Sequence, residues 1–375
     1  MVVFYVSRSW VSHENSGVSH AVYQHAKFLQ SDQYKVVAIG SDPSVSSITC
    51  FAASHYVRSA GSGTIYSPSR VDKRRLNELF DIYNPEILVV EAWQVSICHA
   101  AINAASKRNI PIVMVSHGCS VFPFNLTIKQ ILRSLLWLPF TYYTLPKLVR
   151  KLSLISALDL ESVSNRFYDR CLAKKYNIPL YELTNYPFFS GENRSYVGNR
   201  NNRIVILGYF SEVKNQLALI KYIDKFPKEF DFVFIGDVQG GYFHECLSAA
   251  KKQKTNSRIM FYSDKDVDIS YELSNCFLLL CISITEVLPI TLLEANSFGT
   301  PFLSTPVGAV KRLKGGIVCR ISSMPMMLSM LSQSPVLWKT LSNRGIEQVK
   351  SSFSESHVKG QFKGIIDHAI SLTVK

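Results

Sequence analysis

The chain has 375 residues, which is more than twice the ~150 residues of a typical domain, so two domains are expected and a single small module is excluded. With 47% hydrophobic and only 18% charged residues, its composition is that of a folded protein and not of a disordered one. Its 41 Lys and Arg residues against 28 Asp and Glu residues give a formal net charge of +13, which indicates an anionic partner.

The excess positive charge is concentrated in one region. Between Glu91 and Asp159 there is no acidic residue. The same span contains seven basic residues, which are Lys107, Arg108, Lys129, Arg133, Lys147, Arg150 and Lys151. Because the residues between them are aliphatic and aromatic rather than polar, an anionic membrane surface is favoured as the partner over a nucleic acid. No nucleic-acid partner is therefore predicted.

Short β-branched or aromatic runs alternate with longer helical patterns along the chain. In the first half, strands are expected at 2–6, 35–39, 87–91 and 112–116, with a first crossover helix over 18–29. A second series begins at 203–207 and continues at 232–235, 258–262, 277–282 and 301–304. This alternation of strands and helices predicts α/β structure in two doubly wound domains, each with a parallel sheet covered by helices.

The two series are separated by residues 186–202, which are rich in turn formers and are interpreted as a linker. We therefore predict an N-terminal Rossmann-like domain at 1–185, a second domain at 203–350, and a C-terminal helix at 351–375 that packs back on the first domain. Open α/β sheets bind ligands beyond the carboxyl ends of their strands, so the active site is expected in a cleft between the two domains.

Residues 126–151 do not fit the alternation. An apolar stripe of Ile128, Ile131, Leu132, Leu135 and Leu136 lies opposite a polar stripe of Lys129, Gln130, Arg133 and Ser134. Pro139 and Pro146 are expected to interrupt this helix, and together with its charges they make it a poor transmembrane span. Two interpretations remain open, an interfacial helix with an aromatic and basic rim and an ordinary helix that faces the core.

The eight cysteines are scattered and form no Cys-x-x-Cys pair, so neither a zinc site nor a disulfide framework is expected. The apolar start at 1–6 is too short for a secretory signal and has no basic residues before it. A cytoplasmic protein with structural thiols is therefore predicted.

The most informative stretch is 285–301, in which Glu286 and Glu294 are separated by seven residues. If a strand ends before Glu286 and a helix begins near Pro289, then Glu286 lies in the connecting loop and Glu294 about one turn into the helix. The first N–H groups of that helix would form an anion site. A carboxylate accepts paired hydrogen bonds from the vicinal hydroxyls that ribose and pyranose rings offer.

This stretch resembles the E-x7-E region of retaining glycosyltransferases of family 4, which have the GT-B fold of two facing Rossmann-like domains. The segments 299–301 and 304–308 resemble the strand and turn that follow it. The resemblance implies that Glu286 contacts the donor sugar as a catalytic residue and that Glu294 holds the ribose of the nucleotide. The residues between them that would contact the donor are Leu288, Pro289, Ile290 and Thr291.

Upstream, residues 206–216 are similar to the first strand and loop of the family's nucleotide domain, in which an Arg and a Lys hold the donor diphosphate. Lys214 occupies the Lys position and is expected to act in catalysis, with Asn215 beside it in the donor site. Tyr209 stands at the Arg position, a departure that removes one of the two cations while remaining part of the donor site. A Lys ammonium is a suitable point-charge partner for a diphosphate.

Two residues of the first domain also match the family. Gly17 falls at the glycine loop that opens the first helix, where backbone amides approach the donor diphosphate or the acceptor. His117, directly after the expected strand at 112–116, matches a position near the reacting sugar and is included among the catalytic residues. A lone His is otherwise more often structural.

The resemblance implies a retaining, metal-independent glycosyltransferase of the hexosyltransferase type. It would move a sugar from a nucleotide diphosphate sugar to a hydroxyl of a glycan or lipid-linked acceptor. The first domain would bind the acceptor and the second the donor. No metal and no cofactor are expected, because Lys214 and helix N-termini would neutralise the diphosphate. The expected setting is synthesis of O-antigen, capsule or lipopolysaccharide, with the protein peripheral on the inner face of the cytoplasmic membrane.

Alternative functions also remain. A GT-B-fold nucleotide-sugar epimerase or a phosphorylase would need different chemistry in the same cleft. A non-catalytic protein that binds membranes or nucleic acids would not require Glu286 and Glu294. A nicotinamide-dependent oxidoreductase has no support, because no G-x-G-x-x-G follows any predicted strand.

Overall fold

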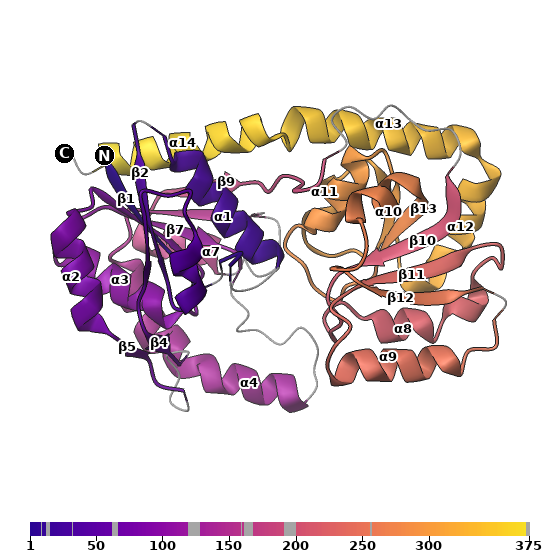
Figure 1. Cartoon of the computed structure of the whole chain (residues 1–375), viewed down its shortest axis with the longest axis horizontal. Helices are drawn as coiled ribbons and strands as arrows, with labels where there is room; N and C mark the ends of the chain where they lie inside the picture. The colour runs from indigo at the N-terminus through magenta and orange to yellow at the C-terminus, as the bar shows by residue number, and fades with distance from the viewer. Residues whose placement is uncertain are drawn as a thin grey trace. The chain divides into compact units, whose positions relative to one another are not determined.

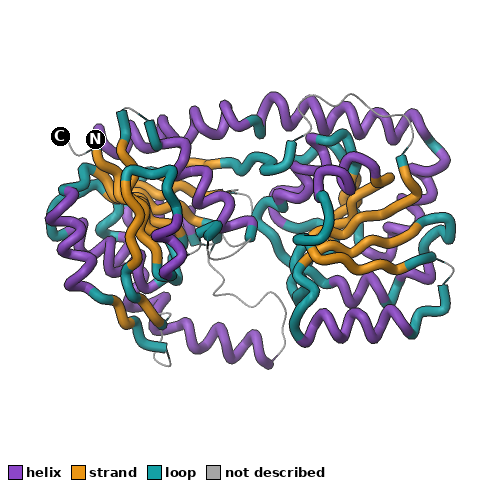
Figure 2. The backbone as a smooth tube through the Cα atoms, viewed as in Figure 1, coloured by secondary structure: helices purple, strands orange, loops and turns teal. Residues whose placement is uncertain are grey.

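A computed structural model of the chain describes residues 1–8, 10–12, 16–31, 33–61, 67–118, 128–158, 160, 168–190, 200–255 and 257–372. The chain divides into two compact units. Unit 1 comprises Met1–Thr184 together with Val358–Lys375, and unit 2 comprises Asn185–His357. Each unit has its own parallel sheet with helices on both faces (Figures 1 and 2). The predicted fold class, two doubly wound α/β domains, is confirmed.

Unit 1 contains a seven-stranded sheet. Its strands are β1 (Val2–Val6), β2 (Lys35–Gly40), β3 (Ala53–Tyr56), β6 (Ile87–Glu91), β7 (Ile112–Ser116), β8 (Leu154–Leu158) and β9 (Leu180–Leu183). All pairs are parallel, and the strand order is β3-β2-β1-β6-β7-β8-β9. The order switches direction between β1 and β6, which is the place where open α/β sheets bind ligands. A small antiparallel hairpin pairs β4 (Ser59–Ala60) with β5 (Arg70–Val71).

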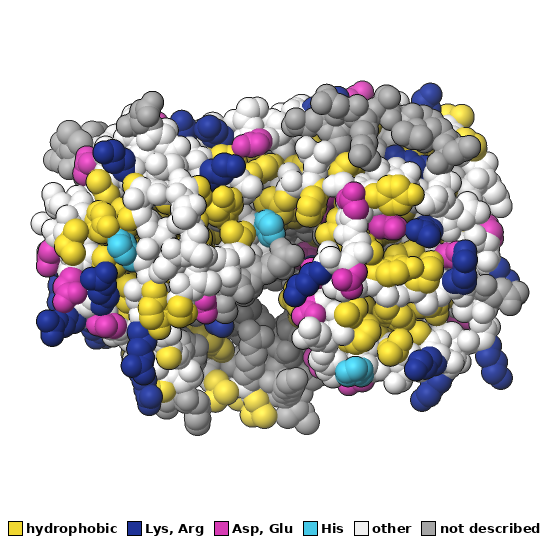
Figure 3. Space-filling model, viewed as in Figure 1, with side chains coloured by type: hydrophobic (Ala, Val, Ile, Leu, Met, Phe, Trp, Pro, Cys, Tyr) yellow, Lys and Arg dark blue, Asp and Glu magenta, His cyan; other side chains and the backbone are white. Residues whose placement is uncertain are grey.

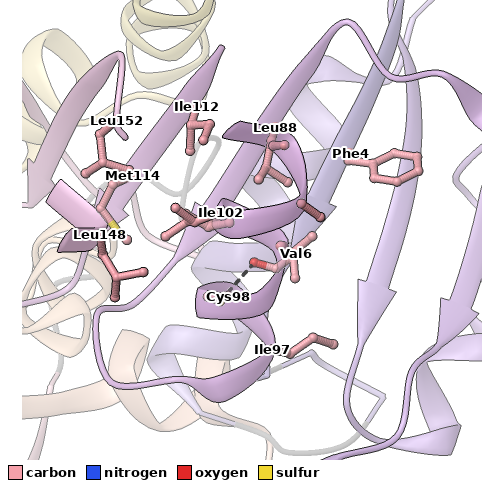
Figure 4. Close-up of a cluster of buried hydrophobic side chains, with 14 of the residues drawn as sticks. Phe4, Val6, Leu88, Ile97, Cys98, Ile102, Ile112, Met114, Leu148 and Leu152 are labelled. Atoms are coloured by element: carbon pink, nitrogen blue, oxygen red, sulfur yellow. Dashed lines mark hydrogen bonds between the residues drawn. The ribbon is translucent and has the colours of Figure 1, made fainter. Parts of the chain in front are cut away.

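One face of this sheet packs against α2 (Lys73–Tyr83), α3 (Ser96–Ser106), α5 (Leu145–Val149) and α7 (Asp169–Tyr176). Figure 4 shows Phe4 and Val6 of β1 and Leu88 of β6 on the side of the sheet where α3 presents Ile97. The Cys98 thiol of α3 donates to the carbonyl of Val6 at 3.5 Å (Figure 4). The central strands are continuous apolar runs because helices cover both of their faces.

The other face of the sheet packs against α1 (Gly17–Leu29) and the C-terminal helix α14 (Glu355–Ser371). The Phe362 ring of α14 lies 5.0 Å from the His25 ring of α1 and 6.5 Å from the Tyr5 ring of β1, centroid to centroid. From Val358 onward the last helix therefore belongs to unit 1. Of the segment interpreted as a linker, residues 191–199 lie outside the described residues.

Unit 2 contains a six-stranded parallel sheet of order β12-β11-β10-β13-β14-β15. The strands are β10 (Asn201–Leu207), β11 (Asp231–Gly236), β12 (Ile259–Ser263), β13 (Cys276–Cys281), β14 (Phe302–Ser304) and β15 (Gly316–Val318). One face packs against α8 (Gln216–Ile220), α9 (Gly241–Lys251) and α12 (Met324–Gln333). The opposite face packs against α10 (Ile269–Asn275) and α11 (Ile290–Ser297). The long helix α13 (Pro335–Ser352) packs against both α11 and α12.

Every strand expected from the sequence is present, with ends that differ by at most two residues. The sequence pattern did not reveal β3, β8, β9 and β15, nor the two-residue strands β4 and β5 of the hairpin. β3 and β9 are the edge strands of their sheet, and they contain polar residues that weaken the apolar signal. β8 is preceded so closely by a helical segment that no turn signal separates the two.

The amphipathic segment forms α4 (Ile128–Pro139), a π-helical turn η2 (Phe140–Thr144) and α5, while residues 126–127 lie outside the described residues. The α-helix ends at Pro139, as expected, and the chain continues through the π turn to α5, in which Pro146 is the second residue. Proline removes one N–H donor and crowds the turn before it, which for Pro146 is the π turn, and a local π bulge accommodates both effects. Among the described residues, no helix is long and apolar enough to cross a membrane.

Candidate functional site

The loop after β10 places Lys214. Gly208 ends the strand with a φ of 145°, and a Cβ atom added there would lie 3.6 Å from Cε of Lys214, whose side chain passes over this glycine. The loop turns back because the N–H groups of Lys214 and Asn215 donate to the Ser211 carbonyl at 3.1 and 3.0 Å. Gly236 is required nearby, since a Cβ atom there would lie 2.3 Å from the Gly208 carbonyl oxygen.

The Lys214 ammonium meets the Glu286 carboxylate, which lies in the loop between β13 and α11. Nζ of Lys214 is 2.6 Å from Oε1 of Glu286, and the hydroxyl of Ser283 donates to the same oxygen at 2.7 Å. The two charged side chains are 22% and 15% exposed, so a ligand can reach both. Burial alone would lower the pKa of Lys214, but the Glu286 carboxylate outweighs it and the pKa is raised. Lys214 therefore remains a cation.

Two contacts hold the Glu286 loop against its surroundings. Gly308 has a φ of 47°, and a Cβ atom there would lie 2.0 Å from the Val287 carbonyl oxygen. The N–H of Ala309 donates to that carbonyl at 2.8 Å, and the N–H of Ile284 donates to the Val213 carbonyl at 2.8 Å. The loops that carry Lys214 and Glu286 are thus bonded to each other through their backbones.

Asn215 lies beside this ion pair in the left-handed region, with a φ of 61°. Its side-chain amide donates to the Ile282 carbonyl at 3.3 Å. Tyr209 is 55% exposed, and its ring centroid is 5.9 Å from Nζ of Lys214. The residue that replaces the family's Arg therefore contacts the remaining Lys through its aromatic face, an arrangement typical of a cation–π contact.

The helix α11 begins at Ile290, directly after Pro289, and no side chain caps its N-terminus. Ile290 and Thr291 are half-buried, whereas Leu288 and Pro289 are buried. The Leu288 side chain belongs to the core, so any donor contact from this residue must come from its backbone. The positive end of the helix dipole favours an anion at this place.

Glu294 lies about one turn into α11, as expected, but its side chain is enclosed. The residue is 3% exposed, and its carboxylate accepts hydrogen bonds from the N–H groups of Phe188 and Phe189. The hydroxyl of Ser297 donates to the Phe189 carbonyl at 3.2 Å, so this short segment lies against α11. Burial raises the pKa of Glu294 to about 7. The structure thus brings Glu286 together with Lys214 and leaves Glu294 in a separate enclosure.

In unit 1, Gly17 is the first residue of α1 and is exposed. The helix begins there because Ser16 and Ser19 form a capping box, in which each side chain accepts the N–H of the other residue at 3.1 and 2.9 Å. The expected glycine loop spans 15–19, and its first residue, 15, lies outside the described residues.

His117 follows β7, and its Nε2 contacts Oε2 of Glu91, the last residue of β6. Glu91 is fully buried and also receives Tyr5 and His25 at its other carboxylate oxygen. Sequence reasoning missed Glu91, although a carboxylate at the carboxyl end of an otherwise apolar strand was a signal. Burial would raise the pKa of Glu91, but the charges and hydrogen bonds of His117 and His25 lower it to about 2.

A cavity of about 390 Å³ opens within unit 1 at the carboxyl ends of β1, β2 and β6. It is lined mainly by polar residues, among them Arg8, Ser41, Asp42, Gln94 and Ser96. The cavity therefore lies at the switch point of the sheet, where a ligand of this unit is expected.

The prediction that no metal is bound took no account of one acidic run, residues 264–268, which contains the Asp-x-Asp pattern of the metal-dependent GT-A class. In the structure this run forms the turn after β12, and Asp268 caps α10 by accepting the Tyr271 N–H at 3.1 Å. Among the described residues, no group of three His, Cys, Asp or Glu side chains is placed to hold a metal ion. The pattern thus has a structural role as a turn and helix cap.

Residues 193–314 match the family model described as glycosyl transferases group 1. The matched region includes Lys214, Glu286 and α11. No curated protein matches the chain in sequence.

Several solved structures resemble the whole chain in fold. Alr3699/HepE of Anabaena, in complex with UDP and glucose, has a TM-score of 0.75 and 13% identity over 98% of this chain and 100% of that one. Sucrose-phosphate synthase of Thermosynechococcus elongatus has a TM-score of 0.73 and 11% identity over 99% of both chains. WaaG, a glycosyltransferase involved in lipopolysaccharide biosynthesis, has a TM-score of 0.65 and 13% identity over 97% of this chain and 99% of that one.

The fold and the matched region define the class. The chain has the GT-B fold of these structures, and its second unit contains the region that matches the model described as glycosyl transferases group 1.

Proposed function

We propose that this chain is a retaining, metal-independent glycosyltransferase. Its donor is a nucleotide diphosphate sugar bound by unit 2, and its acceptor is a hydroxyl of a glycan or lipid-linked molecule bound by unit 1. The observation that carries the proposal is the accessible pair of Lys214 and Glu286, 2.6 Å apart, beside the uncapped N-terminus of α11. A cation and a helix N-terminus together suit a diphosphate, and the adjacent carboxylate suits the hydroxyls of the sugar.

In the proposed reaction, the bond between C1 of the sugar and the diphosphate oxygen breaks, and a bond from C1 to the acceptor oxygen forms on the same face of the ring. The acceptor proton passes to the departing phosphate. The protein stabilises the charge that develops on the leaving group, and this is the role of Lys214 and the α11 dipole. With Tyr209 in place of a second cation, Lys214 is the charged side chain on which this stabilisation depends.

The donor is tested by incubating the protein with UDP-, GDP- and ADP-sugars and following thermal stability, since a ligand of the native state raises the unfolding temperature. Transfer to a glycan acceptor is then followed with the stabilising donor, in the presence and absence of EDTA. An axial donor bond should give an axial product by NMR, and EDTA should have no effect. An inverted product would contradict retention, loss of activity with EDTA would contradict metal independence, and a donor epimer without transfer would favour the epimerase.

We further propose that unit 1 binds an anionic membrane through α4 and η2, at the cytoplasmic face where envelope polysaccharides are assembled. WaaG, a glycosyltransferase involved in lipopolysaccharide biosynthesis, has the same fold, and this likeness supports the proposed setting. Four residues of the apolar stripe are between 41% and 55% exposed, namely Ile131, Leu132, Leu135 and Leu136. Figure 3 shows hydrophobic side chains at the lower edge of unit 1, where α4 lies. These exposures disfavour the core-facing interpretation of the helix.

The rim of this surface has the residues that suit a lipid headgroup region. Tyr142 and Tyr143 of η2 are each 71% exposed, and Lys147 and Arg150 of the following turn are exposed as well. Phe140 is buried against His99 of α3, so the surface is anchored to unit 1 at its base. Apolar side chains bordered by Tyr and basic residues are typical of interfacial helices.

The membrane proposal is tested by co-sedimentation with vesicles that contain phosphatidylglycerol. Binding should fall as salt rises, because screening weakens the attraction of the basic side chains. The variant L132S/L135S should bind at least tenfold more weakly. The control is Ile82→Ser, which removes an apolar side chain that is 66% exposed on α2 and should leave binding unchanged. Equal binding by both variants would contradict the assignment of α4.

A further inference from the structure

Unit 1 contains a buried polar cluster that the proposed chemistry does not use. It consists of Tyr5 of β1, His25 of α1, Glu91 of β6 and His117 after β7. The hydroxyl of Tyr5 donates to Oε1 of Glu91, and Nδ1 of His25 lies 3.2 Å from the same oxygen. Nε2 of His117 contacts Oε2. Each carboxylate oxygen is therefore occupied, and the cluster joins two neighbouring strands, a helix and the end of a third strand.

The burial of this cluster separates Glu91 from any ligand. Glu91 is fully buried, Tyr5 is fully buried and His25 is 1% exposed, whereas the side chain of His117 is 10% exposed. The thiol of Cys98 on α3 donates to the Glu91 backbone carbonyl at 3.3 Å and closes the side of the cluster that faces α3. Only His117 reaches the surface, so Glu91 can act on a ligand only through that ring.

The hydrogen-bond geometry sets the proton position on His117. A carboxylate accepts and does not donate, so the nitrogen that contacts it must carry hydrogen. Burial would raise the pKa of Glu91, but its histidine partners lower it to about 2, so the group is a carboxylate at neutral pH. Nε2 of His117 is therefore the protonated nitrogen. Nδ1 has no hydrogen-bond partner among the residues that the structure describes.

The backbone around the cluster is strained in a way that supports a functional role. Ala92, directly after Glu91, has a φ of 77°, which costs a non-glycine residue about 1 kcal/mol or more. Its N–H donates to the Val115 carbonyl of β7 at 3.1 Å, so this hydrogen bond holds the end of β6 against the strand that precedes His117. Gly118, directly after His117, also has a positive φ, of 85°.

We propose that Glu91 is a positioning residue, which fixes the proton of His117 on Nε2 and so leaves Nδ1 as the atom that meets the sugar substrate. This inference rests on the proposed function for the identity of the substrate. Through His25, Glu91 also holds α1, which begins at Gly17. The buried carboxylate of Glu91 thereby fixes the positions of the His117 ring and of α1, and both are expected to contact substrate.

The first test needs no substrate. In the wild-type protein, ring ¹⁵N shifts of His117, assigned with His117→Ala, should show hydrogen on Nε2 throughout the pH range in which the protein is folded. In Glu91→Gln the ring should lose this preference. A neutral ring with hydrogen only on Nδ1 in the wild-type protein would overturn the proposal, as would unchanged shifts in Glu91→Gln.

The second test is a double-mutant cycle on transfer. Glu91→Gln should lower kcat at least tenfold with little change in the donor KM, and it should cause no further loss in the His117→Ala background, because its effect passes through that ring. Asp169→Asn is the matched control. Asp169 is fully buried and accepts from Ser116 at 2.8 Å and from Trp93 at 2.9 Å, without contact to His117, so its effect should add to that of His117→Ala.

The two tests separate the inference from the proposed function. If the wild-type protein transfers no sugar from any donor while the His117 ring behaves as expected, the proposed function fails and the positioning role of Glu91 stands. If transfer is normal and Glu91→Gln lowers it equally in both backgrounds, Glu91 is a structural residue and the inference is wrong. Should Glu91→Gln fail to fold, the proton position in the wild-type protein decides.

Discussion

Glu91 in unit 1 and Glu294 in unit 2 are both almost completely enclosed carboxyl groups, yet their pKa values move in opposite directions. The pKa of Glu91 is lowered to about 2, and that of Glu294 is raised to about 7. Burial acts against the charge in both. Two imidazoles face Glu91, whereas the partners of Glu294 within the described part of the chain are the backbone N–H groups of Phe188 and Phe189. Neutral donors do not compensate for lost hydration as well as opposite charges do. Because both carboxyl groups are buried, the groups that contact each of them, and not burial, account for the opposite shifts of their pKa values.

Glu286 differs from both because it is accessible. It is paired with Lys214 at the surface of unit 2, where a ligand can exchange with either member of the pair. Of the three carboxylates, the enclosed two can support structure or position another group, and the half-buried Glu286 can meet a substrate.

The largest effect is expected for Lys214→Met, which removes the cationic member of the accessible pair. Transfer, as kcat/KM, should fall by about 100-fold or more, as when one preorganised donor to a developing negative charge is lost. The fold should be preserved by circular dichroism. Lys221→Met, at an exposed lysine that ends α8, should change transfer by less than about twofold. A folded Lys214→Met protein with wild-type turnover would remove Lys214 from the site.

Gly308→Ala should displace the loop that carries Glu286 without replacing Glu286 or Lys214 themselves. The added Cβ would lie 2.0 Å from the Val287 carbonyl oxygen, at a φ of 47° that favours glycine. The free energy of unfolding should fall by about 2 kcal/mol, and transfer should fall because the Glu286 loop must move. Urea unfolding and steady-state kinetics measure the two effects. Unchanged transfer despite lower stability would show that the loop position is unimportant.

The enclosed carboxylates should give the two units opposite pH dependences. Because the folded pKa of Glu294 is raised, its contribution to stability is present below pH ~4.5 and is lost as the pH rises through about 7. The loss amounts to about 3 kcal/mol or less. Because the folded pKa of Glu91 is lowered, its contribution is present above pH ~4.5 and is lost as the pH falls toward 2.

Hydrogen exchange resolved by unit measures this difference. Between pH 5 and 8, amides of α11 should lose protection beyond the intrinsic pH dependence of exchange in the wild-type protein and not in Glu294→Gln, which is neutral and keeps the shape of the side chain. Amides of β6 should keep their protection over the same range. Equal pH dependence of Glu294→Gln and wild type would mean that Glu294 does not change its charge between pH 5 and 8.

The smallest effect is expected for Gly364→Ala in α14. A Cβ atom added there meets no atom within 4 Å, and the position is an exposed helix interior. The free energy of unfolding should therefore rise by about 0.5–1 kcal/mol, with transfer unchanged. A destabilised protein would show that this helix is not formed at residue 364. The free energy of unfolding should fall in Gly308→Ala and rise in Gly364→Ala, which would distinguish a required glycine from a replaceable one.

The local elements were well predicted, because they depend on patterns of near neighbours. Apolar runs marked the central strands, and the spacing of 18–29 marked α1, since burial on both faces of a sheet and on one face of a helix leaves these periods in the sequence. The placement of Glu286 in a strand-to-helix loop and Lys214 after β10 followed from the same patterns.

The contacts that define each site residue were not predictable in this way. Glu91 meets residues 86, 66 and 26 positions away along the chain, which are Tyr5, His25 and His117. Glu294 is enclosed by Phe188 and Phe189, over a hundred positions away. The four described residues of the apolar stripe, Ile131, Leu132, Leu135 and Leu136, are exposed, although their pattern is equally typical of a core-facing helix.

The sequence by itself determined the two parallel sheets and the loops in which the charged residues lie, because secondary structure and burial are recorded in short-range periodicity. Only the tertiary structure decided which carboxyl group is paired, which is enclosed and which meets solvent. Those outcomes depend on groups brought together from distant parts of the chain, and the charge of a carboxyl group depends on its nearest partners in space.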